Sequence, residues 1–306
     1  MRIGFALPQV GPIGGPDAIT RVARRAEELG FDSLWVLDRL LYPVNPRAPY
    51  PVGDGTLPIK YKRVLDPIET LTFAAARTER IALGTSVLNI PWYNRVLLAR
   101  RLEVMSSLAA DCVWVWESAW SPDEYEAAGA SWKTRGKGAD ERVSALKAIW
   151  TKDPVEFEGT GYKVAKSFIG LKPIQKPHPP IYMAAYTPGA MKRVAREANG
   201  WFPVGIPLTA VGPMFEQLKG MAQQVGRNPE SLQLVVRGNL EFMASATSKE
   251  RADFTGTPGQ IATDFEAAKN LGANELVCDV QFSPGIETVE DILRRMEDVR
   301  TMAKSS

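Results

Sequence analysis

Short apolar runs and amphipathic stretches alternate along almost the whole chain, and this alternation restricts its fold more than any other feature. The apolar runs are too short for helices and are bounded by glycine and proline, which favours buried strands. Eight strands followed in turn by eight helices predict a closed parallel (β/α)8 TIM barrel rather than an open sheet. The strands are expected at 2–7, 33–37, 80–91, 112–117, 181–185, 200–204, 232–244 and 275–280. The helices are expected at 16–30, 67–78, 97–108, 139–150, 189–198, 211–225, 258–271 and 289–302.

Two longer segments interrupt this regular pattern. The segment from Arg39 to Leu65 contains five prolines and is too long for an ordinary connection, so we expect it to cover a site. The segment from Pro154 to Gln175 follows the fourth helix and is rich in glycine and aromatic residues, which indicates a hairpin-like insertion. Residues 1–306 are therefore predicted to form a single barrel domain that carries both segments.

Composition excludes several classes of function. The 37 basic and 35 acidic residues are interspersed and leave a net charge of +2, which gives no electrostatic case for nucleic acid or an acidic membrane surface. No apolar run approaches the roughly 18 residues of a membrane span, and the N-terminus enters a strand without a signal-peptide pattern. Two cysteines, Cys112 and Cys278, make no disulfide framework, which predicts a reducing cytoplasm.

The common catalytic motifs are missing from the sequence. The only histidine, His178, precedes a strand, on the side of a barrel that serves stability. The sequence has no acidic cluster with metal-ligand spacing, no Gly-x-Ser-x-Gly elbow, and neither a Walker loop nor a Gly-x-Gly-x-x-Gly turn. We therefore expect no metal site and chemistry supplied by an organic cofactor.

Polar residues at the carboxyl ends of the predicted strands mark the expected site, because barrel active sites form there. Asp38 follows the second strand. Thr85 and Ser86 follow Gly84 in the third, where small side chains let a flat ligand approach the backbone.

The stretch from Ala184 to Gly189 follows the fifth strand and opens a helix. Free backbone N–H groups at a helix N-terminus favour a phosphate. The same residues also make an ordinary helix start, with Thr187 as N-cap and Pro188 in the first turn. Both interpretations stay open on these residues alone.

Five stretches in chain order carry a resemblance that covers nearly the whole chain. They are 28–38, 80–88, 120–125, 182–201 and 256–260. Together they resemble the luciferase-like monooxygenase superfamily, and within it the branch that depends on the deazaflavin coenzyme F420. The resemblance implies a barrel in which Asp38 and the Thr85-Ser86-Val87 bulge face the cofactor ring, with a non-prolyl cis peptide at Ser86-Val87.

The same resemblance implies further properties of the site. The backbone at Ala185, Tyr186 and Thr187 is expected to hold the cofactor phosphate, and the protein is expected to be a homodimer acting on a small organic substrate. Asp38 and Arg39 are the residues expected to take part in catalysis. Many relatives have a histidine where this chain has Arg39, which keeps its proton at neutral pH and so is expected to bind an anionic substrate or a cofactor oxygen instead. The proton would then come from water, Tyr42 or Tyr186.

The fourth strand departs from the family pattern of alternating glycines. Residues 108–119 read Leu-Ala-Ala-Asp-Cys-Val-Trp-Val-Trp-Glu-Ser-Ala. Codons for these residues, shifted by one base, can encode Gly-Gly-Gly-Leu-Arg-Val-Gly-Val-Gly-Ile-Gly, the expected family strand. We therefore hypothesise a compensated frameshift, in the gene or its sequencing, over about 106–119, which resequencing would test. If the chain is made as written, Trp114 and Trp116 share one side of the strand, and we expect lower stability and weaker cofactor binding. Alternatively, both indoles line a wide pocket and stack on a planar ligand, and Glu117 adds an acid to the rim.

Three functions follow in order of preference. The first is hydride transfer between F420 and a small organic molecule, and the second is an FMN-dependent monooxygenase reaction. The third is a catalytically impaired barrel that acts as a binding partner. The substrate stays undetermined, and the segment 39–65 is expected to select it.

Overall fold

The computed structural model describes residues 1–109, 111–117, 120–248 and 250–305. Within this part, eight parallel strands close into a barrel in the order β1, β2, β3, β4, β7, β8, β9 and β12, with β12 paired back to β1. The barrel strands are β1 Arg2–Ala6, β2 Ser33–Val36, β3 Ala82–Asn89, β4 Cys112–Glu117, β7 Ile181–Met183, β8 Gly200–Trp201, β9 Gln233–Asn239 and β12 Glu275–Asp279. The predicted (β/α)8 barrel is confirmed.

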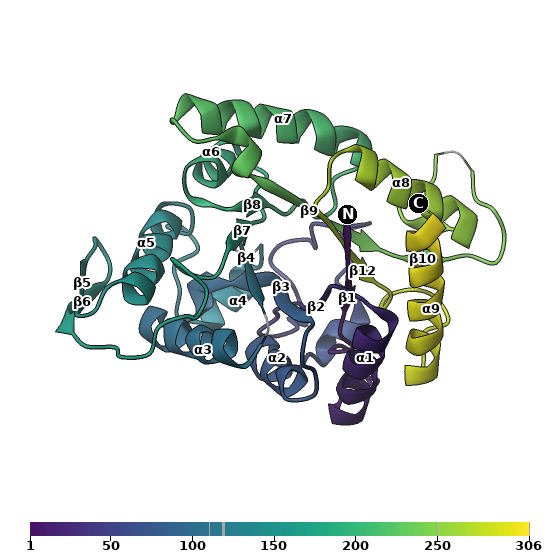
Figure 1. The fold of residues 1–306 in the computed structure, drawn as a ribbon, viewed down its shortest axis with the longest axis horizontal. Coiled ribbons are helices and arrows are strands. Elements are labelled where there is room, and N and C mark those ends of the chain that lie inside the picture. Colours follow the sequence, from purple (N-terminus) through teal and green to yellow (C-terminus); the bar gives the residue numbers. More distant parts are fainter. Residues whose placement is uncertain (110, 118–119, 249, 306) are drawn as a thin grey trace.

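Helices surround the barrel (Figure 1). They are α1 Pro16–Leu29, α2 Pro67–Ala75, α3 Arg95–Leu108, α4 Pro122–Ala127, α5 Lys137–Thr151, α6 Pro188–Glu197, α7 Leu208–Gln224, α8 Pro258–Asn270 and α9 Val289–Ser305. Side-chain caps fix several helix starts: Asp66, Asn94 and Thr187 each accept backbone N–H bonds in the first turn. The short helix α4, which the sequence did not predict, begins in the same way at Ser121.

The two irregular segments differ in structure. The segment 39–65 contains a single short 3-10 turn, Ile59–Lys62, as expected for a covering loop. The predicted insertion forms an antiparallel hairpin of β5 Val155–Glu158 and β6 Lys163–Ser167, which projects away from the barrel (Figure 1).

The seventh predicted strand is longer than the strand that forms. The barrel strand β9 ends at Asn239, and the chain then continues as β10 Glu241–Phe242, which pairs with β11 Thr255–Gly256 outside the barrel. This break leaves the last residues of β9 at the barrel mouth.

A single large side chain fills much of the barrel interior. Trp35 packs against Phe202 with ring centroids 5.7 Å apart, and its indole N–H donates to Ser33 Oγ and Glu275 Oε1 at 2.6 and 3.0 Å. A Cβ at either Gly4 or Gly84 would lie within 2.6 Å of the Trp35 ring, so only glycine leaves room for it. Trp35 and its neighbours therefore fill the barrel interior on this side of the carboxyl end.

Trp114 and Trp116 lie in the outer layer, between β4 and the helices. Both are buried, and Trp116 packs against Trp150 on α5 with ring centroids 6.0 Å apart. They share one side of the strand, as expected, but the alternative in which they line the ligand pocket is wrong. The frameshift hypothesis also covers residues 110, 118 and 119, which lie outside the described residues.

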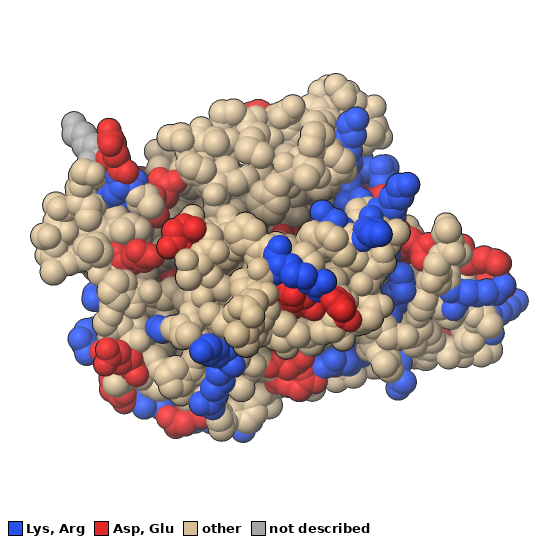
Figure 2. Space-filling model, turned by 180° about the vertical axis from the view of Figure 1, so that it is seen from behind, with Lys and Arg blue, Asp and Glu red and all other residues tan. Residues whose placement is uncertain are grey.

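On the face that Figure 2 shows, acidic and basic side chains are mixed on the lower part and at the sides, whereas the upper part is largely uncharged. This agrees with the nearly balanced charge of the sequence. None of the helices in the described ranges combines the length and apolar character needed to span a bilayer.

Candidate functional site

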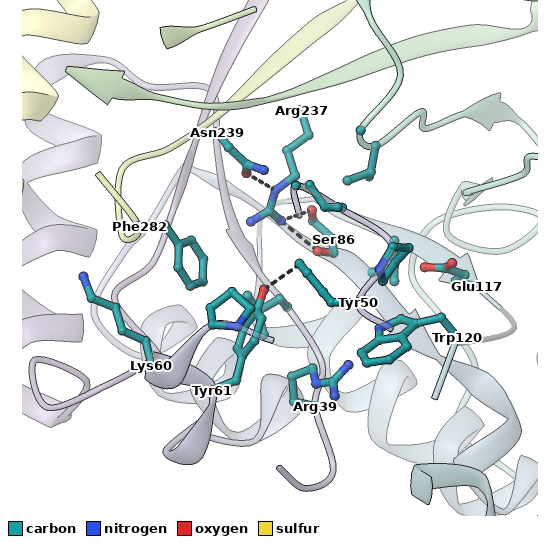
Figure 3. Close-up of a pocket in the computed structure, with 18 of the residues that line it drawn as sticks. Arg39, Tyr50, Lys60, Tyr61, Ser86, Glu117, Trp120, Arg237, Asn239 and Phe282 are labelled. Atoms are coloured by element: carbon teal, nitrogen blue, oxygen red, sulfur yellow. Dashed lines mark hydrogen bonds between the residues drawn. The ribbon is translucent and has the colours of Figure 1, made fainter. Parts of the chain in front are cut away.

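A cavity of about 820 Å³ opens at the carboxyl ends of the barrel strands (Figure 3). Its lining includes Asp38 after β2, Ser86 in β3, Glu117 at the end of β4 and Arg237 in β9. The segment 39–65 supplies a large part of the wall. A volume of this size is typical of small-molecule sites, so the location predicted from the strand ends holds a cavity.

The structure brings some of the predicted site residues together and separates others. Asp38, Arg39, Ser86, Val87 and Tyr186 line the cavity, whereas the other three predicted residues do not. Those three are Thr85, Ala185 and Thr187.

Each of these three makes contacts within the protein. The Thr85 hydroxyl donates to the Val115 carbonyl oxygen at 3.3 Å and accepts from the Val115 N–H at 3.1 Å, which fastens β3 to β4. Ala185 is buried, and its carbonyl oxygen accepts from the Trp201 indole at 3.0 Å. Thr187 is the N-cap of α6.

The bulge in β3 directs Ser86 and Val87 toward the cavity. The register with β4 shifts between Thr85 and Leu88, so the two residues between them leave the ladder. The Ser86-Val87 peptide is cis, as the resemblance implied.

Asp38 is a buried carboxyl group held against the end of β3. Its Oδ2 accepts the Asn89 N–H at 2.9 Å, and the Asn89 side chain donates to the Asp38 carbonyl oxygen at 3.1 Å. Burial raises the pKa of Asp38 to about 7, although the hydrogen bond from Asn89 opposes the shift. Asp38 can therefore hold or release a proton near neutral pH.

Arg39 already has an anionic partner. Its guanidinium lies 3.0 Å from Glu124 on α4, 4.9 Å from the ring centroid of Trp120 and 5.5 Å from that of Tyr61. Both side chains of the ion pair are buried. The pair and the two rings hold the positive charge in place, which the sequence did not predict.

Glu117 is a second carboxyl group on the cavity wall. Removal from water raises its pKa to about 7, and the positive charge of Arg39 opposes the shift. In Figure 3 its carboxylate lies at the side of the cavity near Trp120. The site thus contains two carboxyl groups that titrate near neutrality.

Arg237 is a central residue that the sequence did not reveal. Its guanidinium donates to the Ser86 carbonyl oxygen at 2.9 Å and to Asn239 Oδ1 at 3.0 Å, and it forms a buried ion pair with Asp279 (Figure 3). It therefore links β9 and β12 to the β3 bulge. Because the predicted strand runs past its actual end at Asn239, the rule that sites form at strand ends did not point to it.

The N-terminus of α6 adjoins the cavity at Tyr186. The Ala190 N–H donates to the Thr187 hydroxyl, and the Gly189 N–H has no acceptor among the described residues. A Cβ at Gly189 would meet nothing within 4 Å. An anion can approach this N–H from the open side.

The described part of the chain contains no group of three histidine, cysteine or acidic residues that could hold an ion. His178, half-buried beside Trp150, lies outside the cavity lining.

Comparisons with known proteins identify a family and several relatives. A sequence profile for the luciferase-like monooxygenase family matches residues 1–253. An uncharacterised protein of Mycobacterium tuberculosis (strain H37Rv) is 34% identical over 183 residues, which are 58% of this chain and 64% of that protein. An F420-dependent glucose-6-phosphate dehydrogenase of Amycolatopsis mediterranei is 30% identical over 192 residues, 61% of this chain and 53% of the dehydrogenase. The matches therefore span between half and two thirds of the length of these relatives.

A solved structure shares the complete fold. The monooxygenase RslO1 from Streptomyces bottropensis superposes with a TM-score of 0.79 at 21% identity, covering 99% of this chain and 98% of the monooxygenase.

Proposed function

This chain belongs to the luciferase-like monooxygenase family, and we propose that it is an oxidoreductase that transfers a hydride between the deazaflavin coenzyme F420 and a small organic substrate. The observation that carries the proposal is the cavity at the β3 bulge, which has two near-neutral carboxyl groups on its wall and an open helix N-terminus at its edge. The relative named as an F420-dependent dehydrogenase supports this choice of cofactor.

The residues present fit a planar cofactor that carries a phosphate. Ser86 and Val87 would lie against the ring, and the unpaired Gly189 N–H would take a phosphate oxygen. When bound, the cofactor supplies a hydride donor or acceptor. The chain supplies binding, orientation and proton transfer.

We propose that Glu117 is the group that exchanges a proton with the substrate. Asp38 is fixed by two contacts with Asn89, which suits it to hold the cofactor face of β3. The Glu117 carboxyl group faces the cavity and titrates near neutrality, so it can give a proton to a substrate oxygen or take one from it. Arg39, held by Glu124, limits how far the Glu117 pKa rises.

The first experiment titrates the purified protein with F420 and, separately, with FMN, following fluorescence and thermal stability. We expect F420 to bind and to raise the melting temperature. Binding of FMN alone would replace the proposal with a flavin monooxygenase. Binding of neither to a protein that still melts cooperatively would favour the impaired barrel.

A matched pair of variants tests the phosphate position. Thr257-Pro258-Gly259 opens α8 in the same way as Thr187-Pro188-Gly189 opens α6, and a Cβ at either glycine would meet nothing within 4 Å. A carboxylate at the first glycine would repel a phosphate there. We therefore expect Gly189→Asp to weaken cofactor binding about tenfold or more, and Gly259→Asp to leave it unchanged.

A further inference from the structure

An aromatic wall lines one side of the cavity. Tyr50 lies edge-on to both Tyr61 and Trp120, with ring centroids 6.0 and 5.5 Å apart, and Tyr61 lies edge-on to Phe282 at 5.2 Å. All four rings line the cavity (Figure 3). They come from three separate segments, after β2, β4 and β12, so the wall exists only in the folded barrel.

The two hydroxyl groups of this wall are engaged with each other. The hydroxyl groups of Tyr50 and Tyr61 lie 3.3 Å apart and share a hydrogen bond. Burial raises the pKa of Tyr61 above its ordinary value, so it stays neutral. The wall therefore offers uncharged ring surfaces to a ligand.

The positive charges of the described lining are already committed to protein partners. Arg39 is paired with Glu124, and Arg237 with Asp279. The Lys60 ammonium donates to the carbonyl oxygens of Gln281 and Ile286, at 2.5 and 3.4 Å.

The acidic groups of the lining outnumber these cations. They are Asp38, Asp54, Glu117 and Glu241. A phosphate or carboxylate deep in the cavity would lose its water and would meet two arginines that are already paired with carboxylates, which is unfavourable.

Arg39 also offers a donor to an uncharged oxygen. The Arg39 Nε–H is buried and has no acceptor among the described residues, although Arg39 lines the cavity. A neutral hydroxyl or carbonyl oxygen that reaches this N–H when the side chain turns toward the cavity can accept from it without a further charge.

We propose that this cavity selects an uncharged, largely apolar ring compound with one hydroxyl or carbonyl oxygen, and rejects phosphorylated or carboxylated substrates. The ring packs on the wall of Tyr50, Tyr61, Trp120 and Phe282, and the oxygen faces Arg39 and Glu117. The proposal rests on the proposed function, because the same cavity would also receive the cofactor. It differs from the expectation that Arg39 binds an anionic substrate or a cofactor oxygen.

The test compares 1-naphthol with 1-naphthyl phosphate, which differ only in the phosphate group. Isothermal titration calorimetry is performed on the full chain, with and without F420. We expect 1-naphthol to bind at least about tenfold more tightly than its phosphate ester. Equal or tighter binding of the ester would overturn the proposal.

Variants locate the binding to the aromatic wall. Trp120→Ala should weaken 1-naphthol binding about tenfold, and Trp120→Leu, which keeps more of the apolar volume, should weaken it less. Phe168→Ala is the control, since Phe168 is 80% exposed and outside the cavity lining. Circular dichroism and melting curves show that each variant folds, and unchanged 1-naphthol affinity in a folded Trp120→Ala protein would overturn the proposed position.

The two proposals fail in different ways. If 1-naphthol binds at Trp120 but neither F420 nor FMN binds, the substrate class stands and the proposed function fails. If F420 binds and the phosphate ester is preferred, the proposed function stands and the substrate class fails.

Discussion

Arg237 on β9 reaches across the barrel mouth and donates a hydrogen bond from Nη1 to the carbonyl oxygen of Ser86 on β3, at 2.9 Å. The same guanidinium pairs with Asp279 on β12. Three strands that are far apart in the sequence are thus joined at the bulge where the cofactor ring is proposed to lie.

A double-mutant cycle separates the two tasks of Arg237. Arg237→Gln leaves the buried Asp279 carboxylate unpaired, so we expect the free energy of unfolding to fall by about 3 to 5 kcal/mol. Adding Asp279→Asn should restore much of this stability but not cofactor affinity, because the bond to Ser86 is still missing. Urea unfolding and F420 titration measure the two effects. A double variant that binds F420 like the unmodified protein would rule out a positioning role.

Asp38 should make stability depend on pH. Its pKa is raised to about 7 in the folded protein, so between its ordinary pKa and 7 the folded state holds a proton that the unfolded state has lost. Stability is therefore greatest at low pH and falls as the pH rises to about 7. The Asp38→Asn variant lacks this pH-dependent loss. The difference in free energy of unfolding between the variant and the unmodified protein should therefore increase, in favour of the variant, by on the order of 2 kcal/mol from pH 5 to pH 8. Urea unfolding at both pH values checks this, and a constant difference would contradict it.

Glu117 should control the pH profile of the reaction. If its protonated form supplies a proton, the rate of substrate reduction falls as the pH rises through about 7. In Glu117→Gln the rate should be lower, about 100-fold, and independent of pH in this range. Asp38→Asn is the comparison, since both groups titrate near the same pH. A profile that becomes flat in Asp38→Asn and not in Glu117→Gln would assign the proton to Asp38.

The two indoles of β4 should tolerate replacement by phenylalanine unusually well. The buried Trp114 and Trp116 N–H groups have no acceptor among the described residues, whereas the Trp201 N–H donates to the Ala185 carbonyl oxygen. Removing an unpaired N–H recovers part of the stability lost with the ring volume. We expect Trp114→Phe and Trp116→Phe each to change the free energy of unfolding by less than about 1 kcal/mol, and Trp201→Phe to lower it by about 2 kcal/mol or more. Equal losses in all three would contradict this explanation.

The frameshift hypothesis also makes a prediction. Buried polar atoms without a partner in the described part of the chain gather around this region: both Glu103 carboxylate oxygens, the Ser106 hydroxyl and the two β4 indole N–H groups. Replacing residues 109–119 by Gly-Gly-Gly-Leu-Arg-Val-Gly-Val-Gly-Ile-Gly exchanges both tryptophans for valine. We expect a higher melting temperature, by about 4 °C or more, and tighter F420 binding. A lower melting temperature would indicate that the strand as written is the native one.

Much of the fold was predictable because it follows from local patterns. Strand β4 has the predicted bounds, and the glycines beside Trp35 occur where the barrel interior has no space for a side chain. The α6 start at Thr187 is likewise encoded by adjacent residues. The single domain, the homodimer and the cytoplasmic location remain predictions.

From the residues alone, the candidate site was predictable only where a side chain's position at the end of a single strand places it at the cavity. Asp38 and Ser86 were found in this way. The Arg39–Glu124 pair and the aromatic wall require α4 and the segment 39–65 to pack together, and no local pattern encodes that contact. For Thr85 the sequence could not tell whether the hydroxyl faces the cavity or bonds to the neighbouring strand, and in the structure it bonds to Val115 on β4.

The packing of Trp35 within the barrel determines how ligands exchange. The barrel interior below the cavity is filled by this ring and its neighbours, so among the described residues the cavity does not continue past Trp35. A cofactor that lies against Ser86 would then bind deeper in the cavity, and a substrate at the aromatic wall would bind nearer to its opening. Steady-state kinetics should accordingly be ordered, with cofactor binding first and product leaving before the cofactor is exchanged.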